Sequence, residues 1–103
     1  MRNLPEKVRR ELEAKAAQER AMGRKHHYLK TVQPYFDAQK SGAKPFEVRR
    51  NDRDFAVGDI LHLQEFVPPN TYTGRELLRE VTYILSDPEY CKEGFVVMGT
   101  RGG

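Results

Sequence analysis

The sequence has one cysteine, no tryptophan and no long apolar run. Cys91 alone cannot close an internal disulfide, and no Cys/His spacing indicates zinc, so we expect no metal and no cofactor. His26 and His27 are adjacent, and on a strand they would point to opposite faces rather than to one ion. No segment is long and apolar enough to span a bilayer, and residues 1–25 lack the apolar core of a signal peptide. These absences predict a cytoplasmic protein with no membrane partner.

Charge is abundant but unevenly distributed along the 103 residues. Residues 1–26 contain eight Lys or Arg and four Asp or Glu, a net charge of +4, whereas residues 27–103 contain ten and eleven, a net charge of −1. Nucleic-acid binding by the second part must therefore depend on local clusters of cations rather than on overall charge. The length suits one small domain with an appendage.

Residues 3–22 have the composition of a helix, with Pro5 at its first position and Gly23 after its end. Opposite charges four residues apart, such as Glu6 and Arg10, balance much of its charge. Its thin apolar stripe consists of Leu4, Val8, Leu12, Ala16 and Met22. We expect a helical extension over residues 1–25 that is solvated or loosely docked. Alternatively, this helix could contact phosphates or a protein partner.

The rest of the chain alternates between apolar and polar residues in the manner of β-strands. Residues 26–32 predict a first strand with His27, Leu29 and Thr31 on one face, and Pro34 and Gly42 bound a short helix. Further strands are expected over residues 45–50, 59–67, 75–86 and 95–99. The last is expected to be central, and turn-rich loops over 68–74 and 87–94 connect the strands.

In the strand over 45–50, we place Phe46 and Val48 in the core. Glu47 and Arg49 then share the other face, as the floor of a polar pocket or as a surface ion pair. The expected core also contains Leu61, Leu63, Val81, Tyr83, Phe95 and Val97, and an irregularity is expected near Leu77–Leu78. The pattern predicts an α+β, mainly β domain over residues 26–101. Its architecture would be a small antiparallel or mixed barrel of five or six strands with a helix after the first strand.

The stretch GAKPFEVR, from Gly42 to Arg49, fits the G-x-K-x-x-E-x-R signature of ASCH domains, which belong to the PUA-like superfamily of small β-barrels. The motifs HxLK, YF, NDRDF, VGD, YTGR, VTYIL and GFVVMG accompany it in order along the chain. Over residues 27–100, the sequence resembles an ASCH-related bacterial and phage family of unknown function. The resemblance implies a PUA-like barrel whose cleft binds RNA or a modified nucleoside or nucleotide.

One function that the resemblance implies is a binding module. Lys44 suits a phosphate, Glu47 can accept hydrogen bonds from an exocyclic amine, and Arg49 can make bidentate contacts with phosphate or a base. The residues expected to contact nucleic acid are Lys44, Glu47, Arg49, Arg53, Asn51, Lys30 and Tyr28. For Asn51 the alternative is a purely structural turn, and for Tyr28 it is a place in the core.

The alternative function is a small hydrolase acting on a modified nucleoside or on RNA. One branch of ASCH proteins resembles an amidohydrolase that acts on N4-acylated cytidine with a Lys-Thr-Glu set. Lys44 matches that lysine, and Glu47 occupies the threonine position, so Lys44 and Glu47 would be the catalytic pair. The further carboxylate would come from Glu65, Glu76 or Glu80. Whether the protein is an enzyme is left open by the sequence.

Overall fold

The computed structural model describes residues 5–8, 10 and 24–102. Residues 6–8 and 10 are helical, and Arg10 Nη2 donates to Glu6 Oε1 at 2.9 Å, as their spacing predicts. The rest of the predicted N-terminal helix lies outside the described residues. Within the described ranges, no helix is long and apolar enough to cross a membrane.

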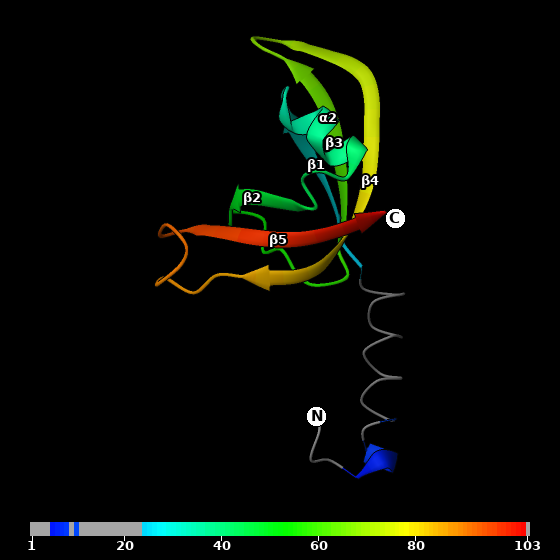
Figure 1. The fold of residues 1–103 in the computed structure, drawn as a ribbon, viewed down its shortest axis with the longest axis vertical. Helices are drawn as coiled ribbons and strands as arrows, with labels where there is room; N and C mark the ends of the chain where they lie inside the picture. The colour runs from blue at the N-terminus through cyan, green and yellow to red at the C-terminus, as the bar shows by residue number, and fades with distance from the viewer. Residues whose placement is uncertain (1–4, 9, 11–23, 103) are drawn as a thin grey trace.

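From residue 24 onward, the chain forms a mainly β domain (Figure 1). Its elements in order are β1 (His26–Thr31), α2 (Tyr35–Ser41), β2 (Phe46–Arg50), β3 (Ile60–Val67), β4 (Thr71–Leu85) and β5 (Phe95–Gly102). The predicted strands and the helix after the first strand are present, which confirms the fold class. β4 begins at Thr71, four residues earlier than predicted, so the loop that precedes it is shorter than expected.

The five strands form one mixed sheet in the order β1-β3-β4-β5-β2. β1 pairs with β3 in parallel, and the other neighbours are antiparallel. Figure 1 shows the long β4 curving from its β3 partner to its β5 partner, which bends the sheet into a half-barrel. The central strand is therefore β4, and the prediction that the last strand is central is wrong. β1 and β2 are the two edges.

Irregular register in β4 decides which side chains face inward. The pairing of β4 with β5 shifts between Val81 and Tyr83, as in a β-bulge, and the chain then changes face. Val81 is buried, whereas Tyr83 is 67% exposed, so the prediction of a core Tyr83 is wrong. A second register shift, in the pairing of β4 with β3, falls between Tyr72 and Glu76, beside the position near Leu77–Leu78 where the sequence predicts an irregularity.

The apolar core is shared by residues of β1, β3, β4, β5 and the loop before β3. Its members are Leu29, Phe55, Leu61, Leu63, Val81, Val96 and Met98. Leu61, Leu63 and Val81 confirm the prediction. Val96 and Met98 occupy the place predicted for Phe95 and Val97, which are only partly buried, because β5 turns the other set of its alternating side chains inward.

β2 also faces opposite to the prediction. Phe46 and Val48 are 40% and 49% exposed, whereas Glu47 is only 2% exposed. The alternation of a strand defines which residues share a face, but not which face is interior. Here the interior beside β2 contains hydrogen-bond donors that satisfy a carboxylate, so the buried position takes Glu47 and the two apolar side chains face outward.

The end of α2 returns the chain toward the sheet and places Lys44. Gly42 adopts the left-handed conformation, with φ 85°, and its N–H donates to Gln39 O at 3.2 Å. Lys44 N–H then donates to Ala38 O at 3.0 Å. The glycine predicted as the helix end is thus the residue that turns the chain into β2.

Candidate functional site

A cleft of about 590 Å³ opens between the two edge strands. Its lining residues are Lys30, Thr31, Val32, Tyr35, Lys44, Phe46, Glu47, Val48 and Arg49. These residues belong to the last part of β1 and the residue after it, to the start of α2, and to β2 together with Lys44, which precedes it. The volume lies within the range of about 300–1,000 Å³ that is typical of small-molecule sites.

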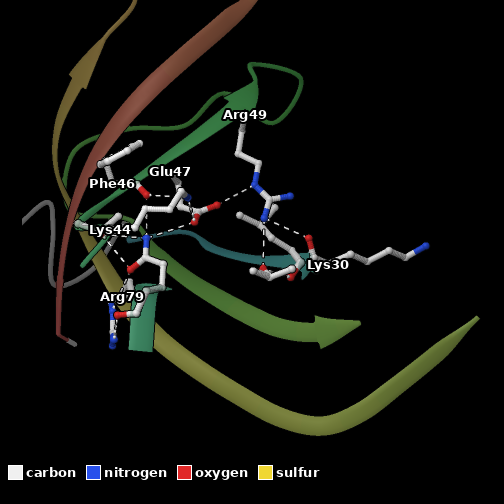
Figure 2. A network of polar contacts seen from close by, with 10 residues as sticks. Lys30, Lys44, Phe46, Glu47, Arg49 and Arg79 are labelled. Carbon is white, nitrogen blue, oxygen red and sulfur yellow. Dashed lines mark hydrogen bonds and ion pairs between the residues drawn. The ribbon is translucent and has the colours of Figure 1, made fainter. Parts of the chain in front are cut away.

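Glu47 forms the floor of this cleft. Its Oε1 accepts hydrogen bonds from Lys44 Nζ at 2.9 Å and Gln39 Nε2 at 3.2 Å, and its Oε2 accepts one from Arg49 Nε at 3.0 Å. Figure 2 shows the carboxylate between Lys44 and Arg49. The structure therefore brings the three motif residues together, with a net charge of +1. Glu47 is buried, and its two carboxylate oxygens accept hydrogen bonds from both cations.

Arg49 links β2 to β1. Its Nη2 donates to Lys30 O at 3.1 Å and to Thr31 Oγ1 at 3.2 Å. Within the described residues, its Nη1 has no hydrogen-bond partner, so two of its five N–H donors remain available. Lys30 joins this cluster through its carbonyl oxygen, while its side chain extends away, with Nζ 4.8 Å from the centre of the Phe66 ring (Figure 2).

Gln39 supports Glu47 from α2, and sequence reasoning missed its role. It is 1% exposed, and its Nε2 lies within hydrogen-bond distance of Phe46 O, Glu47 Oε1 and Thr100 Oγ1. Arg79 of β4 donates to both the side-chain and main-chain oxygens of Gln39. The available signal was the position of Gln39 on the apolar side of a short helix, since a polar residue there requires buried partners.

Two aromatic rings lie close to the ammonium group of Lys44. Its Nζ lies 5.1 Å from the centre of the Phe46 ring and 5.6 Å from that of Tyr35. Tyr35 is 53% exposed and Phe46 is 40% exposed, so both rings are accessible from solvent. The cleft therefore combines flat apolar surfaces with the cationic groups of Lys44 and Arg49. Such a combination suits stacking and phosphate contact.

Arg53 and Asn51 lie in the loop after β2, outside the cleft lining. Arg53 Nη1 donates to Tyr28 O at 3.2 Å, and Arg53 lines a smaller neighbouring pocket together with Arg49. Asn51 Oδ1 accepts from Phe55 N–H at 3.3 Å, which is the turn-forming role given above as its alternative.

A buried pair fixes the far end of that loop. His27 Nε2 donates to Asp59 Oδ2 at 2.8 Å, and the same oxygen accepts from Ala56 N–H at 2.9 Å. The His27 ring also packs on Phe55, with centroids 4.6 Å apart. The histidine at the start of the HxLK motif therefore has a structural contact with the aspartate of VGD.

Tyr28 is on the outer face of the sheet, away from the cleft. It is 54% exposed and stacks on His62, with ring centroids 4.3 Å apart. His62 Nδ1 lies 2.9 Å from Glu76 Oε1, and its Nε2 lies 2.8 Å from His26 Nδ1. Within the part of the chain that the structure describes, no group of three or more His, Cys, Asp or Glu is arranged to hold a metal ion.

The three carboxylates considered as a further catalytic group do not line the cleft. Glu65 accepts from Thr73 Oγ1 at 2.7 Å and Gln33 Nε2 at 2.6 Å, and these bonds, with the nearby charge of Arg75, hold the pKa of Glu65 below its usual value. Hydrogen bonds with His62 and Gln64 likewise lower the pKa of Glu76.

Glu80, the third of these carboxylates, accepts from Arg101, whose Nη2 lies 3.0 Å from Glu80 Oε1. Each of the three therefore has its own partners elsewhere in the domain. Among the residues that the structure describes, Glu47 is the one carboxylate that lines the cleft.

Comparison with known proteins places this domain in a family. A protein of Escherichia phage P2, named "Uncharacterized 12.9 kDa protein in GpA 3'region", is 38% identical over 65 residues, which cover 61% of this chain and 59% of the phage protein. The chain thus spans about three fifths of that relative. The family model described as "Domain of unknown function (DUF3850)" matches residues 26–100, which include every residue of the cleft. The chain therefore belongs to the DUF3850 family.

Proposed function

We propose that this protein binds RNA or a nucleotide in the cleft between β1 and β2, as a PUA-like module related to ASCH domains. The observation that carries the proposal is that two exposed rings, Tyr35 and Phe46, lie near the ammonium group of Lys44. Rings of this kind stack on bases, and the nearby ammonium and guanidinium groups contact phosphate.

The buried carboxylate supports this function indirectly. Lys44 and Arg49 are long side chains that would otherwise sample many rotamers, and Glu47 holds both near one opening. Their side chains remain 18% and 25% exposed, so a phosphate could reach them without displacing Glu47. Both Glu47 oxygens already accept hydrogen bonds. We therefore assign Glu47 to positioning rather than to direct contact with a base.

The test uses the two exposed rings because their removal disturbs folding least. Tyr35→Ala and Phe46→Ala should each weaken the binding of a short fluorescent single-stranded RNA by about five- to 150-fold, since one base–aromatic stack is worth about 1–3 kcal/mol. Tyr90→Ala is the matched control, because Tyr90 is 74% exposed in the loop before β5 and does not line the cleft. Equal affinities of all three variants would contradict the proposal.

Cation contacts have a separate signature in the dependence on salt. Lys44→Ala should reduce the slope of log affinity against log salt by about one if Lys44 contacts a phosphate, whereas Lys92→Ala should leave it unchanged. A hydrolysis assay distinguishes binding from catalysis. If the native chain hydrolyses N4-acetylcytidine while Lys44→Ala and Glu47→Gln do not, the hydrolase hypothesis replaces the binding-module hypothesis.

A further inference from the structure

Within the described part of the chain, the two strands that border the cleft have no strand partner on the side that faces it. There β2 pairs with β5 alone, and β1 pairs with β3 alone. The edges are joined instead by guanidinium groups, because Arg49 donates to Lys30 O and Arg53 donates to Tyr28 O. The half-barrel is thus closed across this gap by side chains, and main-chain groups of β2 remain exposed to the cleft.

The ladder between β2 and β5 shows which main-chain groups these are. Thr100 N–H donates to Pro45 O at 3.1 Å, and Asn51 N–H donates to Gly94 O at 2.8 Å. In an antiparallel pair, hydrogen-bonded and non-hydrogen-bonded positions alternate, so positions 47 and 49 bond to β5 while 46, 48 and 50 point away from it.

The contacts of the outward positions agree with this alternation. Phe46 O accepts from Lys44 Nζ and Gln39 Nε2, and Arg50 O accepts from Asp52 N–H. Val48 lies between them and lines the cleft, yet neither its N–H nor its C=O has a partner among the described residues. Val48 therefore presents one donor and one acceptor, side by side, to whatever occupies the cleft.

We propose that the main chain of Val48 pairs with the Watson–Crick edge of an unpaired base, which makes single-stranded nucleic acid or a free nucleotide the ligand class. This inference rests on the proposed function and adds to it how the base is read. A base presents an acceptor beside an N–H donor on that edge, such as N1 and the N6 amine of adenine, and these complement one N–H and one C=O. A base in a duplex has this edge occupied and is excluded.

The environment of Val48 suits such a pairing. Phe46 lies two residues before it on the same face of β2, so its ring is adjacent to a base that extends the sheet at Val48. Arg49, the next residue, lines the same cleft with its Nη1 donors available. A nucleotide at this place would contact main-chain groups through the edge of its base, an aromatic ring through the face of its base and a cation through its phosphate.

Val48→Pro tests this pairing because it removes the main-chain N–H of residue 48 and leaves its C=O. The N–H points away from β5, so proline breaks no ladder bond, and edge strands accept proline at such positions. Affinity for a short single-stranded oligoadenylate should fall about three- to tenfold, the usual value of one neutral hydrogen bond. Val48→Ala keeps the N–H and should bind within about twofold of the native chain.

A second variant distinguishes loss of the N–H from an effect of proline on folding. Replacement of Val48 by its α-hydroxy acid removes the same N–H without restricting φ, and it should lower affinity as proline does. If both variants bind as the native chain while Phe46→Ala binds weakly, the main-chain pairing is wrong and the proposed function stands. If Phe46→Ala also binds as the native chain, both fail. An equal loss of affinity for duplex and single-stranded RNA would likewise overturn the pairing.

Discussion

Removal of the charge on Glu47 should destabilise the domain far more than removal of a surface charge. Loss of one partner from a buried ion pair costs about 3–5 kcal/mol. In Glu47→Gln, the orphaned Lys44 and Arg49 keep 18% and 25% side-chain exposure, and glutamine preserves the shape and one acceptor. We therefore expect a loss of about 2–3 kcal/mol in the free energy of unfolding.

Urea unfolding monitored by circular dichroism measures this change directly, and a loss of this size should lower the melting temperature by roughly 10–20 °C. Asp52→Asn is the matched control, because it makes the same chemical change in a side chain that is 63% exposed and 3.9 Å from Arg53 Nε. Its effect should stay within about 0.5 kcal/mol.

A loss in Glu47→Gln no larger than that in Asp52→Asn would refute this reasoning. The Lys44–Glu47–Arg49 cluster would then be solvated in the folded chain, and the buried position of Glu47 would contribute nothing to stability. Lys44→Met separates the contribution of the Lys44–Glu47 pair from that of the Arg49–Glu47 pair. The double variant Lys44→Met/Glu47→Gln should lose less free energy of unfolding than the sum of the two single variants, because each substitution removes the same contact.

Three further outcomes follow from other parts of the structure. The pKa of Glu65 is lower in the folded than in the unfolded chain, so its carboxylate contributes stability above about pH 4.3 that is lost as the pH falls through the folded pKa. Because the hydrogen bond from Thr73 is the largest cause, Thr73→Val should raise this pKa in an NMR titration, and an unchanged pKa would contradict that cause. Gly99→Ala should destabilise by about 1–3 kcal/mol, since its Cβ would lie 2.9 Å from Thr82 Oγ1, and Thr82→Ala should recover most of the loss in urea unfolding. Deletion of residues 1–23 should leave a cooperative melting transition, because the core cluster lies between Leu29 and Met98, and a non-cooperative melt would place the N-terminal segment in the core.

Contacts between residues close together in the sequence could be predicted from it, whereas contacts between distant segments could not. Lys44, Glu47 and Arg49 lie within six residues, so the motif alone predicted that they act together, and the structure brings them together. Gln39 and Thr100 reach the same cluster from α2 and β5, and this meeting depends on pairing across the sheet. Tyr28 was grouped with the site, but a strand directs alternate side chains to opposite faces, and Tyr28 is on the outer one.

The amino-acid sequence by itself determined the elements. Alternation predicted the five strands, and Pro34 and Gly42 bounded the helix between the first two, because neighbouring residues determine backbone conformation. The family motif predicted which residues line the cleft. Only the tertiary structure decided which face of β2 is buried, which half of β5 enters the core and which strand is central. Those choices depend on the irregular register of β4 and on donors from α2 and Arg49 that satisfy Glu47, contacts between segments that no local pattern contains.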